Sequence, residues 1–380
     1  MFYLALATLA FFTLFSIESG IGNFRLRSLS SLPATGDEWP RVSIVVAGRN
    51  EEAAVEHAVV SLLALDFPDL ELISVNDRSD DATGAILDRI ASGDSRLRVI
   101  HVTDLPEGWL GKNHALHLGA AGASGTLLLF TDADVMFEPS TLRRAVRYLL
   151  DRDLDHLTAS PKIVVRSPVV GMFVASFGLF FSIFARPWRA TGSNPKHHVG
   201  IGAFNLVKTS SYRQAGGHEP IRMRPDDDMK LAKLLKKTGG RQELVFGRDL
   251  ISVEWYPTIR EVVVGLEKNA FSGVEYSTPR LALATISVLT IFVWPFIGIL
   301  ATTGTTRLLN LAIATMILGS VAIMAGRSGA GPFYYALFFP IGTLLFLYIM
   351  VRAGVKTLRN GGIEWRGTLY PLEELRKNKV

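Results

Sequence analysis

The sequence predicts an α/β domain with a mainly parallel sheet and helices on both faces, flanked by transmembrane helices at both ends of the chain. Short β-branched runs alternate with helical patterns between residues 41 and 280, and long uncharged apolar stretches lie on either side. Of the 380 residues, 48% are hydrophobic and 20% are charged. This composition is too apolar for an ordinary soluble enzyme and too charged for a chain embedded wholly in a membrane.

Residues 1–20 are expected to form a transmembrane anchor. Residues 2–17 contain no charge, and Arg25 and Arg27 follow them. A cleavable signal peptide has basic residues before its apolar run and a small-residue cleavage site after it; neither is present, so we expect an uncleaved anchor. Arg25 and Arg27 predict that the domain at 41–280, which follows a linker at 28–40, faces the cytoplasm.

Four buried strands and four helices are predicted in the first part of this domain. The strands are expected at 42–47, 70–76, 97–102 and 126–130, and the helices at 51–65, 82–90, 113–121 and 140–150. Parallel strands of this kind end at a common edge of the sheet, where ligands bind. Asp77 follows the second strand, and Asp132 and Asp134 follow the fourth. Carboxylates at strand ends are suited to holding a divalent cation against a diphosphate.

Residues 281–352 are expected to contain three transmembrane segments, followed by a basic tail at 353–380. Arg307 and Arg327 divide this region into stretches long enough to cross about 30 Å of hydrocarbon at about 1.5 Å per residue. One amino-terminal and three later crossings would leave the tail opposite the domain. The seven Lys or Arg and three Glu of residues 352–380 instead favour the cytoplasmic side. A re-entrant hairpin at Pro295 would restore the parity, and the sequence leaves both alternatives open.

The composition also excludes several classes of function. There are 40 Lys and Arg against 35 Asp and Glu, a net charge of +5, and no run of five like charges, so no nucleic-acid partner is expected. The chain has no cysteine, which excludes thiolate metal sites and a cysteine nucleophile. The first strand leads into Gly48 and Arg49 without a dinucleotide-binding glycine fingerprint, and there is no Walker A segment.

Four segments, in order along the chain, resemble the motifs of family 2 glycosyltransferases. They are 42–51 (VSIVVAGRNE), 75–83 (VNDRSDDAT), 111–116 (GKNHAL) and 130–134 (FTDAD). The resemblance continues through 200–217 and through 227–232 (DDMKLA), which is similar to the Glu-Asp motif of that family with Asp in place of Glu. It covers about residues 41–276 and implies a GT-A type, Rossmann-like domain. The likeness is greatest to membrane-bound enzymes that glycosylate lipids, including hopanoid-associated, carotenoid and ceramide-type transferases.

The resemblance implies roles for individual residues. Asp132 and Asp134 would form a metal-binding Asp-x-Asp pair for Mg²⁺ or Mn²⁺, and Asp132 would also contact the substrate. Asp228 would be the general base, with Asp227 as the alternative. The other expected substrate contacts lie at strand ends and in the loops that follow them: Arg49, Glu51, Asp77, Asp81, Lys112, Gly202 and Trp255.

Structural roles compete with several of these assignments. Asp77 and Asp81 precede a predicted helix and could cap it. One carboxylate of 226–228 is expected to cap the next helix, while repulsion within the trio would raise a pKa toward the range useful for a base. Lys112, Arg49 and Glu51 could be ordinary surface charges. His197, His198 and His218 are candidate metal or phosphate contacts, although lone histidines are more often structural.

The segment 169–186 is apolar and lies between the Asp132 pair and Asp228 in the sequence. A complete membrane crossing would separate these carboxylates, so we expect an interfacial or re-entrant helix that brings a lipid acceptor to the site. An ordinary buried core helix is the alternative. Phe173, Phe177 and Phe180 are spaced so that they lie on one helical face.

These features predict an inverting, metal-dependent transfer of one sugar from a nucleotide-diphosphate sugar, a UDP-sugar, to a lipid hydroxyl. The enzyme would be a multi-pass protein of the cytoplasmic membrane. Processive polysaccharide synthases contain a Gln-x-x-Arg-Trp motif, whereas none of the six Trp residues here follows an Arg, which favours a single transfer. The alternatives are a polyprenyl-phosphate glycosyltransferase and a non-catalytic membrane scaffold that binds sugar nucleotides.

Overall fold

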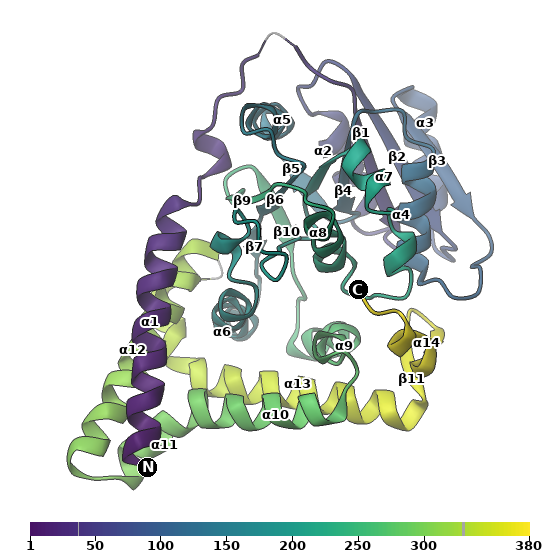
Figure 1. The fold of residues 1–380 in the computed structure, drawn as a ribbon. Coiled ribbons are helices and arrows are strands. Elements are labelled where there is room, and N and C mark those ends of the chain that lie inside the picture. The colour runs from purple at the N-terminus through teal and green to yellow at the C-terminus, as the bar shows by residue number, and fades with distance from the viewer. Residues whose placement is uncertain (37, 329–330) are drawn as a thin grey trace. The chain divides into compact units, whose positions relative to one another are not determined.

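The computed structural model describes residues 1–36, 38–328 and 331–380, and the chain divides into two compact units (Figure 1). Unit 1 comprises Met1–Arg25, Ile163–Arg186 and Trp255–Lys377. Unit 2 comprises Leu26–Lys162, Pro187–Glu254 and Asn378–Val380. Each unit is therefore assembled from segments that are far apart in the sequence.

A seven-stranded sheet forms the centre of unit 2, in the order β3-β2-β1-β4-β8-β6-β9. Strands β1 to β4 pair in parallel, β6 pairs in parallel with β9, and β8 runs antiparallel to β4 and β6. The mainly parallel α/β fold predicted from the sequence is confirmed. The strands of this sheet are β1 (Val42–Gly48), β2 (Leu70–Asp77), β3 (Leu97–Val102), β4 (Leu127–Asp132), β6 (His156–Ser160), β8 (Asn205–Lys208) and β9 (Gln242–Phe246).

Helices cover both faces of this sheet because its strands alternate apolar side chains between two cores. In β1, Ile44 and Val46 pack into one core and Val45 packs into the other. The first core is completed by α2 (Val55–Leu63), α3 (Thr83–Gly93) and α5 (Thr141–Asp151). The second is completed by α4 (Gly111–Ala121), α7 (Thr209–Gln214) and α8 (Asp227–Lys237). A small antiparallel pair, β5 (Val135–Phe137) and β10 (Ile251–Glu254), follows the edge where β4 ends.

The helix predicted at 51–65 is shorter in the structure, because α2 begins only at Val55. The preceding residues form a loop that is bonded to the loop after β2. The Asn50 side chain accepts a hydrogen bond from the Asp80 backbone N–H at 2.9 Å, and the Glu51 N–H donates to the Thr83 hydroxyl at 2.8 Å. Asn50 has a positive φ of 55°, which a helix does not allow. The two loops at the carboxyl ends of β1 and β2 are thus held together.

Unit 1 is largely helical. Within it, α1 packs along α12, and α10 packs along α13 (Figure 1). Its elements are α1 (Phe2–Arg25), α6 (Pro168–Ala185), α9 (Ile259–Ala270), α10 (Thr278–Val288), a π-helical turn (Leu289–Val293), α11 (Trp294–Ala301), α12 (Gly304–Ser328), the 3-10 helix η6 (Phe333–Phe338), α13 (Phe339–Asn360), β11 (Gly362–Trp365), β12 (Thr368–Pro371) and α14 (Leu372–Lys377). The π-helical turn directly precedes Pro295, which has no N–H for the helical ladder.

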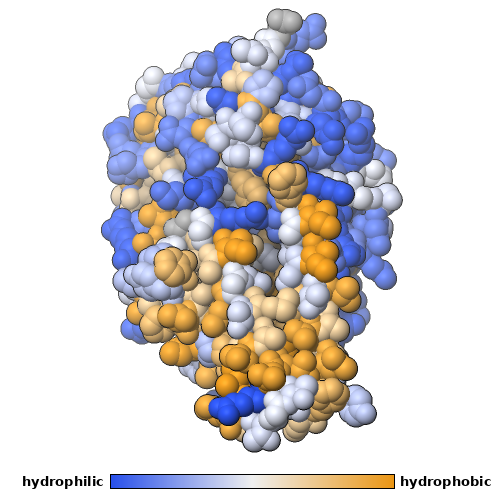
Figure 2. All heavy atoms as spheres, turned by 90° about the vertical axis from the view of Figure 1, so that its left-hand side faces the viewer, coloured by the Kyte–Doolittle hydropathy of each residue, from blue (hydrophilic) through white to orange (hydrophobic). Residues whose placement is uncertain are grey.

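Five helices in the described part of the chain are long and apolar enough to cross a membrane. They are Phe2–Arg25, Pro168–Arg189, Thr278–Ala301, Gly304–Arg327 and Phe333–Asn360. Apolar side chains gather on the surface of α1 and α12, where Leu14, Phe24, Leu308 and Ile323 are exposed (Figure 2). Because exposed apolar surface of this extent is unfavourable in water, unit 1 has the properties of a membrane-embedded unit.

The segment predicted at 169–186 forms the helix α6 and packs against α9, α12 and α13 within unit 1. The Phe180 ring stacks on Phe346 with 4.6 Å between centroids. Phe173 is 1% exposed, whereas Phe184 near the end of the helix is 72% exposed. Packing thus covers most of α6 and leaves Val169 and Phe184 exposed, and its contact with a bilayer or a lipid acceptor stays a prediction.

Candidate active site

The candidate site lies where β4 ends and where α4 and α8 begin, all within unit 2. The edge of a parallel sheet and the free N–H groups of helix N-termini meet at such a position. A small cavity opens there and brings together Lys112, Asp132, Gly202, Asp227 and Asp228, which the sequence motifs had singled out. Its remaining lining residues are Leu116, Phe130, Thr131, Asn205, His218 and Leu231.

Lys112, in the first turn of α4, is surrounded by carboxylates. Its Nζ lies 2.8 Å from Asp132 Oδ1 and 3.4 Å from Asp227 Oδ2. Burial alone would lower the pKa of this ammonium, but the charges of Asp132, Asp227 and Asp228 outweigh burial and raise the pKa. Lys112 is therefore a permanently charged cation at the centre of the site, and not the solvated surface lysine of the alternative interpretation.

Asp228 is held by two backbone amides. Its Oδ2 accepts a hydrogen bond from the Gly202 N–H at 2.9 Å, and its Oδ1 accepts one from the Met229 N–H at 2.7 Å. Burial, and after it the neighbouring charge of Asp227, raises the pKa of Asp228 to about 7. A carboxylate with this pKa is suited to accept a proton near neutral pH.

The loop before β8 approaches α8 so closely that glycine is required. A Cβ at Gly200 would lie 2.1 Å from the Asp228 carbonyl oxygen, and a Cβ at Gly202 would lie 2.6 Å from Asp132 Oδ2. A side chain at Gly200 would collide with the backbone of α8, and a side chain at Gly202 would displace the Asp132 carboxylate. Gly202 thus contributes its backbone N–H and its lack of a side chain to the site.

Asp134 lies in the turn between β4 and β5. Its pKa is raised to about 7 by burial, then by Asp132 and then by Glu51. Carboxylates that repel one another in this way provide the hard oxygen ligands and negative potential that fit Mg²⁺ or Mn²⁺. Among the described residues, no cluster of three or more His, Asp or Glu forms a complete metal cage. A cation here would take few ligands from the protein and the rest from a phosphate or water.

Asp77, Arg49 and Asp81 have different surroundings at the ends of β1 and β2. Both Asp77 carboxylate oxygens accept hydrogen bonds from Arg78, at 2.7 and 3.0 Å. Arg49 Nε is buried and has no hydrogen-bond partner in the described part of the chain. Asp81 accepts from the Thr83 and Glu52 N–H groups at 3.0 and 3.1 Å. The N-cap position of α3 is Ala82 and has no side-chain capping bond, so Asp81 does not occupy the cap; its bonds link the start of α3 to the loop before α2.

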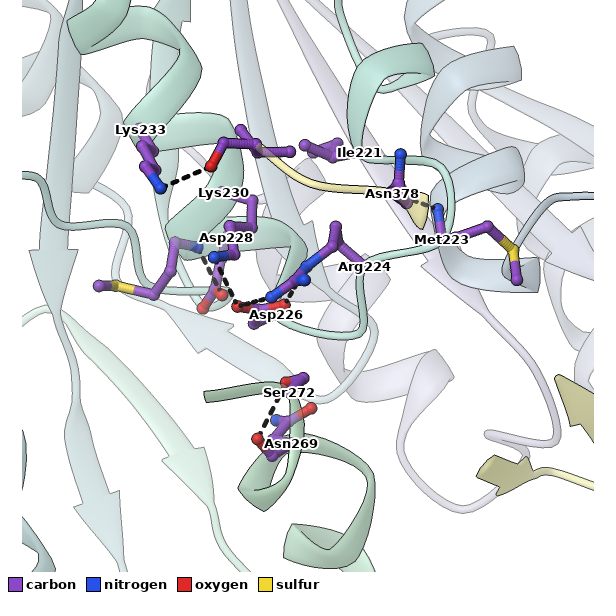
Figure 3. Close-up of polar contacts among 12 residues, drawn as sticks. Ile221, Met223, Arg224, Asp226, Asp228, Lys230, Lys233, Asn269, Ser272 and Asn378 are labelled. Atoms are coloured by element: carbon purple, nitrogen blue, oxygen red, sulfur yellow. Dashed lines mark hydrogen bonds and ion pairs between the residues drawn. The ribbon is translucent and has the colours of Figure 1, made fainter. Parts of the chain in front are cut away.

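The expected capping role for one of the three Asp residues at 226–228 is wrong for Asp226. It occupies the N-cap position of α8 but makes no capping hydrogen bond. Instead, its carboxylate faces the buried Arg224 guanidinium in a bidentate pair, with Oδ1 3.0 Å from Nε and Oδ2 3.1 Å from Nη2 (Figure 3). Burying Arg224 requires a partner charge, and this requirement overrides the cap.

Asn113 was not singled out from the sequence. Its Nδ2 donates to the carbonyl oxygens of Ile221 and Arg224, at 2.8 and 2.9 Å, and lies 3.3 Å from that of Arg222. It thereby fastens the segment before α8 to the first turn of α4, beside Lys112. The motif at 111–116 placed Asn113 near the site, but no local sequence pattern indicated that its amide would bind the carbonyl groups of residues 221–224.

A second missed group is a buried network around His156. His156 Nε2 lies 2.9 Å from Asn205 Oδ1, and His156 Nδ1 lies 2.6 Å from Gln242 Nε2. Burial lowers the pKa of His156 to about 4, which keeps the ring neutral. Asn205 also donates to the Ile201 carbonyl at 2.8 Å, so the network supports the loop that includes Gly202.

Two other candidates, His218 and Trp255, have structural partners. His218 lines the cavity, but its Nδ1 lies 2.7 Å from the Tyr212 hydroxyl and burial lowers its pKa to about 3, so it has a structural hydrogen bond. Trp255 belongs to unit 1, where its ring lies 6.2 Å from that of Phe173 and 5.7 Å from that of Phe177. A role for Trp255 in substrate binding stays a prediction.

Known proteins with the same architecture are glycosyltransferases of GT-A type. A solved mannosyltransferase, PcManGT from Pyrobaculum calidifontis in complex with GDP-Man and Mn²⁺, superposes with a TM-score of 0.55 at 18% identity, covering 94% of this chain and 98% of that one. The family model described as Glycosyl transferase family 2 matches residues 43–214. Residues 43–214 therefore match the family 2 glycosyltransferase model, and the fold is of the GT-A type.

Curated relatives extend the similarity over most of the chain. The 4,4'-diaponeurosporenoate glycosyltransferase of Staphylococcus aureus strain MRSA252 is 22% identical over 348 residues, covering 88% of this chain and 89% of that protein. The same enzyme from strain USA300 is 21% identical over 345 residues, with 88% and 89% covered. The similarity therefore includes the apolar segments as well as the family 2 domain.

Proposed function

We propose that this protein transfers one sugar from a nucleotide-diphosphate sugar, a UDP-sugar, to the hydroxyl of a membrane lipid, with inversion at the anomeric carbon. The observation that supports this most directly is the arrangement of Lys112, Asp132, Asp227 and Asp228 around one cavity. It combines a buried cation suited to a diphosphate with a carboxylate suited to accept a proton. Neither a non-catalytic scaffold nor a plain surface cluster requires both.

In the proposed reaction, the acceptor oxygen attacks the anomeric carbon as the bond from that carbon to the diphosphate oxygen breaks. The acceptor proton passes to Asp228, whose oxygens are oriented by the Gly202 and Met229 amides. The ammonium of Lys112 stabilises the negative charge that develops on the departing nucleoside diphosphate. Attack opposite the leaving group accounts for inversion.

Asp132 and Asp134 would hold Mg²⁺ or Mn²⁺, which would neutralise part of the diphosphate charge when bound. Burial, and then the charges of Asp132 and Glu51, raises the pKa of Asp134, and this excess of negative charge supports a cation at this position. Arg49, with its unpartnered buried Nε, is the second candidate for a phosphate contact. Asp77 would contact the nucleotide base only after its oxygens separate from Arg78.

The acceptor is assigned to the membrane because unit 1 has five helices apolar and long enough to span it. The bacterial relatives and the basic residues after α1 support the cytoplasmic membrane, with unit 2 on the cytoplasmic face. A single transfer is favoured because no Trp in the sequence follows an Arg, as the polymer-binding motif of processive synthases requires.

An acceptor that is already ionised is the second candidate, as in a polyprenyl-phosphate glycosyltransferase. The name of the related 4,4'-diaponeurosporenoate glycosyltransferases favours this alternative, because diaponeurosporenoate is a carboxylate. A phosphate or carboxylate oxygen has no proton to lose near neutral pH and hardly needs a base. An Asp228→Asn variant with unimpaired turnover would favour this acceptor class.

Turnover of nucleotide sugars by the purified protein in lipid, with and without Mg²⁺ or Mn²⁺, tests the proposal. Mass spectrometry of lipids from cells with the active chain and with Asp228→Asn would identify the product. We expect one sugar increment on one lipid class and metal-dependent release of nucleoside diphosphate. Full activity in EDTA would contradict the metal role, and an absence of both lipid product and donor turnover would contradict the enzyme function.

A further inference from the structure

The segment 215–226 connects α7 to the first turn of α8, where Asp227 and Asp228 lie. It contains the short 3-10 helix η3 (Glu219–Ile221) and turns. Backbone groups outside a regular ladder need other partners when they are buried. On one side, Asn113 binds carbonyl groups of this segment, as described above. The position of Asp227 and Asp228, which follow directly, therefore depends on side chains that hold the segment.

On another side, the same segment is held by Asn378, from the far end of the sequence (Figure 3). Its Oδ1 accepts a hydrogen bond from the Met223 N–H at 3.0 Å, and its Nδ2 donates to the Pro220 carbonyl at 2.9 Å. Both ends of one side-chain amide thus bind backbone groups three residues apart. An amide is the group that can accept and donate in this way at once.

The residues after Asn378 are bound to α8 itself. Lys233 Nζ donates to the Val380 backbone oxygen at 2.6 Å, and the Val380 side chain packs against the core that contains Leu231 and Leu235 of α8. Lys379, between these two contacts, is exposed. The segment 378–380 thus joins the loop before the candidate base to the helix that contains it, entirely within unit 2.

We propose that Asn378 is a positioning residue for Asp228. It touches no reacting atom; it fixes Pro220 to Met223, and through them the first turn of α8, so that Asp228 stays on the Gly202 amide. This inference rests on the proposed function, in which Asp228 is the base. A displacement of about 1 Å in a catalytic group can cost about 10²-fold in rate, so a loose segment is expected to reduce turnover.

The test compares Asn378→Ala with the adjacent control Lys379→Ala in the full-length protein. Asn378→Ala is expected to lower kcat by about 10- to 100-fold and to leave the KM for the nucleotide sugar within about two-fold, because Lys112 and the strand ends are not moved. Lys379→Ala is expected to behave like the wild type. Wild-type kcat in Asn378→Ala, or a parallel loss of donor affinity, would overturn the proposal.

A more conservative variant and a structural measurement cover the case in which Asn378→Ala folds poorly. Asn378→Asp keeps the acceptor for the Met223 N–H and loses the donor to Pro220, so its kcat is expected to lie between those of the wild type and the alanine variant. Hydrogen exchange should accelerate at the Met223 and Gly202 amides in Asn378→Ala, and less at Met223 in Asn378→Asp, which keeps the acceptor for that N–H. Faster exchange at Met223 with unchanged exchange at Gly202 would confine Asn378 to local stability and overturn the positioning role.

Measuring Asp228→Asn in parallel separates this inference from the proposed function. If Asp228→Asn loses turnover and Asn378→Ala does not, Asn378 does not position the base while the base assignment stands. If neither loses turnover, both proposals are wrong. If both lose turnover and Asn378→Ala accelerates exchange at both Met223 and Gly202, the positioning role is supported.

Discussion

Two clusters of buried charge, one in each unit, have opposite compositions. In unit 2, one ammonium, Lys112, is surrounded by Asp132, Asp227 and Asp228. In unit 1, one buried carboxylate, Glu267 of α9, is bound by two cations of α13: Arg352, and Lys356 at 2.9 Å. The first cluster has an excess of negative charge and the second has none.

This difference distinguishes a reactive site from a set of ion pairs that stabilises the fold. Burial, and after it the repulsion between neighbouring carboxylates, raises the pKa of Asp134 and of Asp228, and a bound cation or proton relieves that repulsion. A carboxylate that is already paired with two cations does not require a further cation or proton, and its ion pairs instead join two helices. Substitutions in the first cluster should therefore change catalysis, and substitutions in the second should change stability.

The largest effect is expected for Asp134→Ala. Removing this carboxylate from the pair with Asp132 leaves the diphosphate charge poorly compensated, so transfer should be abolished and metal-dependent nucleotide binding weakened. Activity and nucleotide binding are measured with and without Mn²⁺. If the variant keeps wild-type activity, the excess negative charge of this cluster does not serve a cation.

The pH dependence sharpens the comparison. Asp228 must be deprotonated to act as a base, and its pKa is raised to about 7, so turnover should rise with pH through about 7. Asp227→Asn removes the neighbouring negative charge that raises this pKa, so the midpoint should move to lower pH. Profiles of kcat against pH for both proteins check this, and an unmoved midpoint would show that Asp227 does not act on Asp228 through its charge.

Glu267→Gln should affect stability and leave catalysis nearly unchanged. The substitution leaves the partly exposed Arg352 and Lys356 without their shared carboxylate, and because solvent screens both cations the thermal midpoint should fall by about 1 to 3 °C. Donor KM and kcat below the midpoint should stay within about two-fold of the wild type, since the candidate site lies in unit 2. A large loss of kcat in a stably folded variant would mean that the two clusters are not functionally distinct.

The prediction with the smallest expected effect concerns the side of the membrane on which the tail lies, and a labelling experiment tests it. Unit 2 includes residues both before Ile163 and after Arg186, and again after Lys377. If unit 2 stays on one side of the membrane, α6 is not a single crossing, and an even number of the three apolar helices after Glu254 cross. We therefore expect the tail on the side of unit 2, as its positive charge favours.

Because the chain has no cysteine, single introduced thiols can report this topology. Lys379→Cys should be labelled by a membrane-impermeant maleimide from the same side as Lys196→Cys, an exposed position of unit 2. Labelling from opposite sides would contradict the parity argument and restore three complete crossings.

The sequence predicted the elements that depend on local patterns. The strand expected at 97–102 has these bounds in β3, because a short buried strand is defined by its own apolar residues. The motif residues Lys112, Asp132, Gly202 and Asp228 do meet at one cavity, because parallel strands end at a common edge.

The contacts that position these residues could not be predicted. Asn378 binds Met223 across 155 residues, and Asn113 binds Arg224 across 111. Hydrophobic periodicity reports which face of an element is buried, but it does not report which distant carbonyl an asparagine amide will meet. The same limit applied to Asp226, whose partner Arg224 became decisive only because folding buries that guanidinium.

The turnover of Asp228→Asn tests the central claim most directly. The substitution keeps the shape of the side chain and removes its ability to take a proton, so kcat should fall by about 10²- to 10⁴-fold while the affinity for the nucleotide sugar stays nearly unchanged. Donor binding and single-turnover transfer are measured on the same preparation. A normal rate of transfer to the lipid acceptor with normal donor binding would show that Asp228 is not the base, and would contradict the account.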